Sequence, residues 1–221
     1  MAYFNKDFIK FFKELAANNN KAWFDENRKR YITSVKEPHV AFVEDIANKI
    51  HKLDKTVETD PKKCIFRINR DIRFSKDKTP YKTYLGAVIA KGGKKGVDFP
   101  GYYLELGPEG FKIYGGLYVL DKTKLEKVRK HIAKDPKVLR KLLNAKAFKT
   151  GFGEIRGEKN KIVPKQFKEA LEKEPLIANK QFYYFKKFPA SKITDAKLDQ
   201  IVLKEVKTLM PLNDYFRKAA R

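Results

Sequence analysis

Apolar residues at helical spacing mark the N-terminal part of the chain. One such face predicts an amphipathic helix that ends around residues 18–20, and it consists of Phe4, Phe8, Phe11, Phe12 and Leu15. Asn20 is placed to cap a second helix that begins near Trp23. The apolar pattern then continues to residue 53 across Pro38, where we expect either a kink or a fresh helix start.

Period-two alternation replaces the helical pattern in the middle of the chain. It predicts strands at 66–74, 84–90, 102–106 and 111–119. The first of these segments also shows an apolar stripe at helical spacing, but its isoleucines and phenylalanines favour a pleated surface. Read as a strand, it places Arg67, Asn69, Asp71 and Arg73 in a polar row on one face. The connections between these segments are short, which favours antiparallel pairing.

The helical pattern returns in the last hundred residues. Asp121 is placed to cap one helix, Pro136 precedes another, and Pro164 opens a third. Residues 151–157 indicate a loop, residues 181–188 are aromatic and basic, and a final helix is expected over about 195–209. These elements predict an α+β fold, with a central antiparallel sheet of about four or more strands flanked by several α-helices. We expect a single globular domain over residues 1–221.

The charge of the chain is its largest compositional deviation. The 221 residues carry a net charge of +23, while 42% apolar and 35% charged residues are typical of a globular protein. A charge of this size attracts polyanions in general, so nucleic acid, anionic lipid head groups and phosphorylated metabolites are all compatible partners. A solvated, lysine-rich surface with no specific partner explains the charge equally well.

Several classes of chemistry find no support in the sequence. Cys64 is the one cysteine, so no intrachain disulfide can form, and it is expected as a packed thiol. The three histidines lack the spacing of metal ligands, and residues 92–96 lack the Walker pattern of a phosphate loop. We therefore expect no metal and no cofactor. No apolar run approaches eighteen residues, which predicts a cytoplasmic protein without a membrane span.

Three carboxylates raise the alternative of a metal-dependent nuclease. They are Asp71, Asp77 and Glu105, and such sites commonly pair carboxylates on strands with a lysine. No lysine stands two positions after Glu105, and Asp71 between Arg70 and Arg73 is more simply a carboxylate that neutralises arginines. The nuclease interpretation is therefore the weaker one.

Residues 64–84 form a strongly basic block that also identifies a family. The block contains six cations against two anions, Asp71 and Asp77; the cations are Arg67, Arg70, Arg73, Lys76, Lys78 and Lys82. Residues 67–82 resemble the signature of the domain-of-unknown-function 2461 family. The resemblance extends to Asn19–Phe24, Asn27, Arg28 and Tyr31 upstream, and to Pro100–Glu105, Gly115–Tyr118, Leu125, Val128 and Arg129 downstream. The family has no established activity, so the resemblance implies no reaction.

The basic block is the best candidate for a binding site. Arginine suits bidentate binding of phosphate or carboxylate, lysine adds point charges, and tyrosine offers hydroxyls and flat surfaces. We predict a concave anion-binding site from Arg67, Arg70, Asp71, Arg73, Lys78, Tyr81, Lys82, Tyr103 and Glu105. In the competing interpretation, Arg70 and Asp71 form a buried ion pair that only holds the sheet to a helix.

Three functions follow from these observations. The first is binding of an anion or a nucleic acid through the basic block. The second is an enzyme that acts on a phosphate-containing substrate, and the third is a protein-interaction domain, which requires an exposed apolar patch. The sequence does not decide whether the protein is an enzyme.

Overall fold

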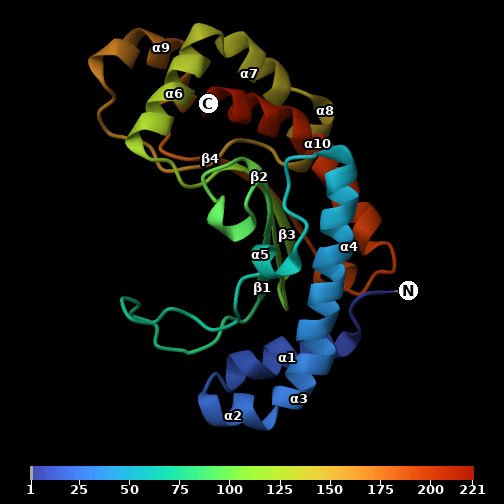
Figure 1. Ribbon diagram of the computed structural model, residues 1–221. Helices are drawn as coiled ribbons and strands as arrows, with labels where there is room; N and C mark the ends of the chain where they lie inside the picture. Colours follow the sequence, from blue (N-terminus) through green and yellow to red (C-terminus); the bar gives the residue numbers. More distant parts are fainter. Residues whose placement is uncertain (1) are drawn as a thin grey trace.

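The computed structural model describes residues 2–221 and contains a four-stranded antiparallel sheet. Its strands follow one another in space as in sequence: β1 (Leu85–Ile89), β2 (Gly101–Gly107), β3 (Gly110–Leu117) and β4 (Phe182–Phe188). Helices flank the sheet, so the predicted α+β class with a central antiparallel sheet is confirmed (Figure 1). The predicted strands at 84–90, 102–106 and 111–119 correspond to β1, β2 and β3.

Ten α-helices precede, interrupt and follow the strands in the described part of the chain. They are α1 (Lys6–Ala17), α2 (Lys21–Glu26), α3 (Arg28–Tyr31), α4 (Glu37–Leu53), α5 (Pro61–Cys64), α6 (Lys122–Lys134), α7 (Pro136–Leu143), α8 (Lys146–Gly151), α9 (Lys168–Lys173) and α10 (Leu198–Ala219). The predicted caps are confirmed, because the Asn20 side chain accepts from Trp23 N and the Asp121 side chain accepts from Lys124 N.

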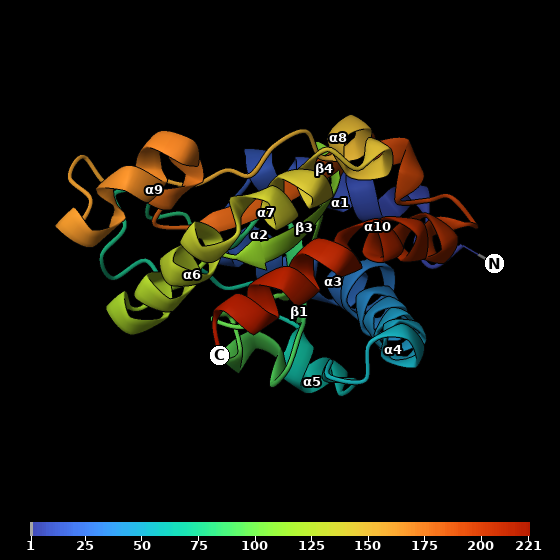
Figure 2. The same ribbon diagram turned by 90° about the horizontal axis from the view of Figure 1, so that it is seen from above.

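Two long helices, α4 and α10, lie against one face of the sheet and against each other (Figures 1 and 2). Alternate strand residues point to this face, and they are fully buried; they include Leu85, Ala87, Ile89, Leu104, Leu106, Ile113 and Leu117. The aromatic side chains Tyr102, Phe182 and Tyr184 belong to the same layer. The resulting core is continuous with the phenylalanine-rich face of α1.

The region around Pro38 is a continuation of one helix. A π-helical segment, Ile32–Lys36, joins α3 to α4, and Pro38 occupies the first turn of α4. Lys36 and Glu37 keep helical backbone angles, and no side chain caps the start of α4. The helix therefore runs on through the π-helical segment, and the fresh start that was one of the two expectations at Pro38 is not what the structure shows.

The predicted strand at 66–74 is wrong. Residues 66–82 instead leave the sheet as an irregular two-stranded arm, which projects at the left of Figure 1. The arm pairs with itself at Asn69 and Tyr81, through Arg70 N to Pro80 O and Lys82 N to Ile68 O. Its alternating apolar residues do not share a buried face, since Ile68 is 6% exposed and Phe74 is 95% exposed.

The C-terminal half departs from the prediction in two places. The aromatic segment 181–188, which the pattern left unassigned, forms the edge strand β4. The last helix continues to Ala219, about ten residues beyond its predicted end, and Pro211 lies inside it at an exposed position. None of the helices in residues 2–221 is both long and apolar enough to cross a lipid bilayer.

Candidate functional site

The sheet face opposite α4 and α10, called the open face below, carries three rows of residues at paired positions. A glycine row consists of Gly101, Gly116 and the paired Tyr183. An aromatic row consists of Val88, Tyr103, Tyr114 and Phe185. A charged row consists of Gly86, Glu105, Lys112 and Lys187. Each row runs across the strands, because residues that are paired on neighbouring strands point to the same face of the sheet.

The aromatic row forms a connected surface across three strands. The ring centroids of Tyr103 and Tyr114 are 5.3 Å apart, and those of Tyr114 and Phe185 are 5.0 Å apart. At the β1 side, Phe66 from the base of the arm meets Tyr103 edge to face at 6.2 Å. The Tyr103 ring lies directly over Gly86, where a Cβ atom would come within 2.7 Å of its hydroxyl oxygen. The missing side chain at Gly86 therefore leaves room for the Tyr103 ring to pack on the backbone of β1.

A cavity of about 570 Å³ lies over this face. Its floor is the aromatic row together with the glycine row, and its walls come from three other segments. The arm contributes Phe66 and Lys82, the loop before β2 contributes Val97 and Phe99, and the segment after β3 contributes Tyr118. The glycine row also includes the Tyr183 side chain, and the space over Gly101 is filled by Ala90, whose Cβ lies 2.3 Å from where a Cβ at position 101 would be.

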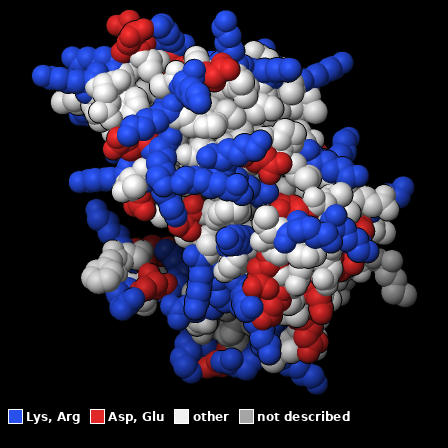
Figure 3. All heavy atoms as spheres, turned by 45° about the horizontal axis from the view of Figure 1, so that its top comes forward, with Lys and Arg blue, Asp and Glu red and all other residues white. Residues whose placement is uncertain are grey.

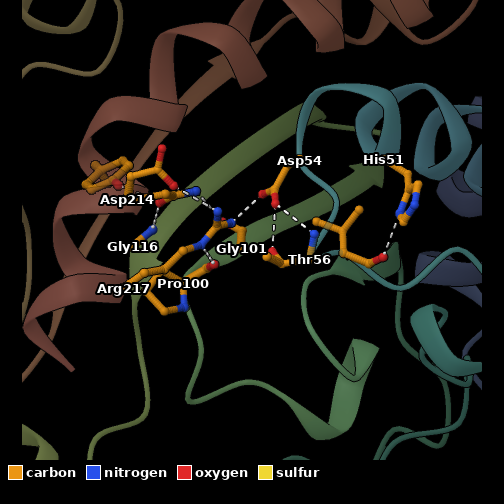
Figure 4. Close-up of polar contacts among 11 residues, drawn as sticks. His51, Asp54, Thr56, Pro100, Gly101, Gly116, Asp214 and Arg217 are labelled. Atoms are coloured by element: carbon orange, nitrogen blue, oxygen red, sulfur yellow. Dashed lines mark hydrogen bonds and ion pairs between the residues drawn. The ribbon is translucent and has the colours of Figure 1, made fainter. Parts of the chain in front are cut away.

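A buried polar network holds the cavity wall that precedes β2 (Figure 4). Arg217 on α10 donates from Nε to the carbonyl oxygen of Pro100 at 3.0 Å, and its other nitrogens pair with Asp54 and Asp214. Its guanidinium also lies 5.3 Å from the centroid of the Phe99 ring. The wall residue Phe99 is thus fixed to the helical layer behind the sheet.

Asn213, next to Asp214 on α10, holds the backbone of the glycine row from the helical side of the sheet. Its Oδ1 accepts from Gly116 N at 2.9 Å and from the Tyr184 hydroxyl at 2.7 Å, while its Nδ2 donates to Gly101 O at 3.0 Å. Gly116 has φ +94, and a Cβ there would lie 2.1 Å from Phe182 O. Only glycine suits this position without strain.

Charged groups surround the aromatic row. Lys112 donates to Glu105 at 2.6 Å within the charged row. The Arg156 guanidinium lies 4.2 Å from the Phe185 centroid, and Lys82 Nζ lies 5.4 Å from the Phe66 centroid and donates to Arg67 O. Burial, followed by the nearby Arg67 charge, lowers the pKa of Lys82. Burial thus destabilises the charged form of Lys82, and an anion bound nearby would stabilise that form again.

The phenols of the row stay protonated. Burial, followed by the charge of Glu105, raises the pKa of Tyr103 well above its ordinary value and also raises the pKa of Tyr114. Both hydroxyls can therefore donate hydrogen bonds near neutral pH.

The structure brings together only part of the predicted site. Lys82, Tyr103 and Glu105 meet at the cavity. Tyr81 is buried under the arm, where its ring stacks on Phe24 at 4.0 Å. The remaining predicted residues do not line the cavity but lie on the arm, at its base or toward its tip; they are Arg67, Arg70, Asp71, Arg73 and Lys78.

The alternative of a buried Arg70–Asp71 ion pair is wrong. Arg70 pairs with Asp77 and with the Thr79 hydroxyl, whereas Asp71 pairs with Arg73 at 2.7 Å. The Asp71 and Arg73 side chains are largely exposed, at 48% and 76%. Both observed pairs lie within the arm, because the segment turns back on itself, and neither joins the sheet to a helix.

Sequence reasoning missed several residues of the open face. Tyr114, Tyr183, Phe185 and Arg156 were not among the predicted site residues, although they lie on or over it. Tyr114 could have been found as Tyr103 was, since it alternates with apolar residues in a predicted strand. Phe185 could not, because residues 182–185 are aromatic at every position and show no period.

The carboxylates of the nuclease alternative do not converge. Asp77 pairs with Arg70, Asp71 pairs with Arg73, and Glu105 pairs with Lys112. Residues 2–221 contain no cluster of three or more His, Cys, Asp or Glu side chains that could hold a metal ion. Burial raises the pKa of the Cys64 thiol to about 11, so this side chain is a packed thiol as expected.

Comparisons with known proteins place the chain in a family and go no further. No curated protein and no solved structure matches it. A model of conserved hypothetical proteins, DUF2461, matches residues 7–215, which is nearly the whole chain. The chain therefore belongs to the DUF2461 family.

Proposed function

We propose that the open face binds single-stranded nucleic acid. The observation that carries the proposal is the aromatic row of Tyr103, Tyr114 and Phe185, exposed to a cavity and bordered by cations. Every nucleobase has a flat π-face, so bases stack on aromatic side chains with little dependence on sequence. Phosphates between successive bases would lie toward the basic residues at the two ends of the row.

Cations lie at both ends of the aromatic row, where the phosphates of a bound single strand would lie. Arg67 and Lys82 lie at the β1 side of the row, and Arg156 and Lys187 lie at the β4 side. Space-filling atoms in Figure 3 show basic side chains over much of the surface, including around the projecting arm. An isolated phosphate or carboxylate would need few of the aromatic contacts. The mostly aromatic lining therefore supports nucleic acid over a small anion.

Fluorescence anisotropy with single-stranded RNA and with duplex DNA, across a salt series, tests the proposal. Replacing Tyr103 and Tyr114 by leucine keeps apolar volume and removes the stacking surface. We expect a loss of about 5- to 150-fold in affinity for single strands, corresponding to about 1–3 kcal/mol for a stacked base. Thermal melting checks that the double variant is folded. Equal binding of the single strand by wild type and variant would refute the role of the row.

A second pair of variants tests the electrostatic part. Arg67→Gln/Lys78→Gln removes two cations from the arm, and Lys137→Gln/Lys141→Gln removes two exposed cations from α7. Each phosphate contact on a single strand contributes about 0.7 to the slope of log affinity against log salt. The arm variant is expected to lower that slope by about 1.4, and the α7 variant to leave it unchanged. Equal effects of both variants would indicate general attraction by the net charge.

The proposed location is the cytoplasm. Cys64 is the one cysteine of the chain and is buried as a free thiol, in keeping with a reducing compartment.

A further inference from the structure

Phe74 at the tip of the arm is 95% exposed, an unusual position for a phenylalanine. Among the large apolar side chains described as exposed, Ile162 follows at 85% and the others are at most 60%. Arg73 lies over its ring, with the guanidinium 5.8 Å from the centroid. A ring in water contributes nothing to folding through burial.

The exposure of Phe74 does not result from an unstructured arm. At the base, Asn19 Nδ2 donates to Tyr81 O at 2.9 Å and Asn19 Oδ1 accepts from Tyr81 N at 3.1 Å. Along the arm, backbone bonds connect Arg70 to Pro80 and Lys82 to Ile68 at 2.9 Å.

The tip is fixed by side chains that reach across it. Lys78 Nζ donates to Ile72 O at 2.9 Å, and the Asp77 carboxylate accepts from Thr79 N at 2.9 Å. That bond, followed by the bond from Arg70, lowers the pKa of Asp77 to about 2, so the carboxylate is charged near neutral pH. The arm therefore holds Phe74 outward in a defined position.

The arm is also strongly basic and lies next to the cavity. It carries six cations against Asp71 and Asp77, and its base supplies Phe66 and Lys82 to the cavity wall. A strand of nucleic acid on the aromatic row would thus continue along a positively charged path. Figure 3 shows this arm standing off from the body of the molecule at the lower left.

We propose that the arm is a wedge for a junction between single-stranded and double-stranded nucleic acid, and that Phe74 inserts at the terminal base pair and unstacks it. This inference rests on the proposed function of the open face. Apolar side chains commonly insert between base steps when flanking cations hold the phosphates. Phe74 is eight residues beyond Phe66, so it lies at most about 29 Å away. At about 3.4 Å per phosphate, the junction would lie within about nine nucleotides of the aromatic row.

An anionic membrane surface is the other target that a basic tip with one aromatic ring could meet. Two observations favour nucleic acid. The tip presents one large apolar side chain, Phe74, which would bury little area in a bilayer. The arm also begins at the aromatic cavity, to which a membrane would have no access.

The test uses a DNA hairpin with a single-stranded tail and 2-aminopurine at the base pair next to the tail. Wild type is expected to raise the 2-aminopurine fluorescence, because the wedge unstacks that base. Phe74→Ala is expected to abolish the rise and to weaken binding of the tailed hairpin by about fivefold or more, the loss of one stacked base. Phe74→Trp should retain both effects, and the matched control Ile162→Ala should behave as wild type.

A single-stranded tetranucleotide separates this inference from the proposed function. It contains no base pair for Phe74 to unstack, so its affinity should not change in Phe74→Ala. If the tetranucleotide binds through Tyr103 and Tyr114 but the hairpin shows no effect of Phe74, the wedge is refuted and the open face stands. If wild type binds neither probe, both proposals fail. Co-sedimentation with phosphatidylserine vesicles that is lost in Phe74→Ala would identify a membrane target and overturn the wedge.

Discussion

Arg217 links three parts of the molecule through one buried guanidinium. It joins α10 to Asp54 at the end of α4 and to the backbone of Pro100 before β2, and its side chain is only 9% exposed. Asp54 is equally enclosed, at 3%, and also accepts from the Thr56 hydroxyl at 2.6 Å. A buried charge with these partners costs little, but the same charge without them costs several kcal/mol.

Replacing Arg217 by methionine is therefore expected to be strongly destabilising. The change keeps much of the side-chain volume but leaves Asp54 buried without its cation, so the unfolding free energy should fall by about 3–5 kcal/mol. Urea denaturation measures this quantity. Arg73→Met, at an exposed ion pair, is the matched control and should change it by at most about 0.5–1 kcal/mol. Similar values for the two variants would show that Arg217 does not hold the wall through a buried charge.

The buried, neutral His39 should make the protein less stable in mild acid. It is 1% exposed on α4, and its Nε2 has no hydrogen-bond partner among the described residues. Burial lowers its pKa to about 3. The stabilising effect is fully present above the unfolded pKa of about 6.5 and declines as the pH falls toward the folded pKa, by up to about 1.4 kcal/mol per pH unit.

The measurement is the unfolding free energy in urea at about pH 7, above the unfolded pKa of histidine, and at about pH 5, where the histidine term has begun to lower stability. His39→Leu removes the group that must stay neutral, so the variant should lose less stability than wild type over that range. The contrary result, an identical pH dependence for both proteins, would show that protonated His39 is accommodated in the fold.

Elements with a clear period were the ones that the sequence pattern predicted. The strands β1 to β3 and the helices with an apolar stripe follow this rule. The arm was mistaken for a strand because its alternation is real but short-range, and its hydrogen bonds return to its own chain at Pro80 and Ile68. The strand β4 has aromatic residues on both faces, so no alternation marks it. The helix α10 passes Pro211 because its buried contacts continue to Ala219.

The arm should behave as an element with its own local stability, fixed at one point. Asn19 binds both backbone groups of Tyr81, so Asn19→Ala removes two hydrogen bonds at the base of the arm. We expect faster hydrogen exchange in peptides from residues 66–84 and unchanged exchange in β2 and β3, because the loss of about 1–3 kcal/mol falls on the local opening of the arm. Hydrogen–deuterium exchange read by mass spectrometry gives both results. Asn48→Ala, which removes one exposed bond within α4, is the control, and uniform acceleration in β2 and β3 would contradict the prediction.

At the scale of the molecule, the candidate site depends on contacts that local pattern does not contain. The basic block is contiguous in sequence, so composition alone revealed it. The aromatic row requires the registers Tyr103 to Tyr114 and Tyr114 to Phe185, the second of which joins strands separated by more than sixty residues. Register between distant strands is set by packing of the whole sheet. The charges of the site were therefore predictable, and its stacking surface was not.

The net charge of +23 acts on the whole fold as well as on its partners. Fifty Lys and Arg residues face 27 Asp and Glu residues, so most surface cations lack a counterpart and repel one another in the compact state. Raising NaCl from about 10 mM to about 100 mM shortens the Debye length from about 30 Å to about 10 Å, which screens this repulsion more than it weakens close ion pairs. Thermal melting should therefore shift upward, by about 2–4 °C for each kcal/mol of repulsion removed. Lys137→Gln/Lys141→Gln, which lowers the charge on α7, should show a smaller shift. A melting temperature that falls with salt would instead show that surface pairs such as Lys21–Asp25 outweigh the repulsion.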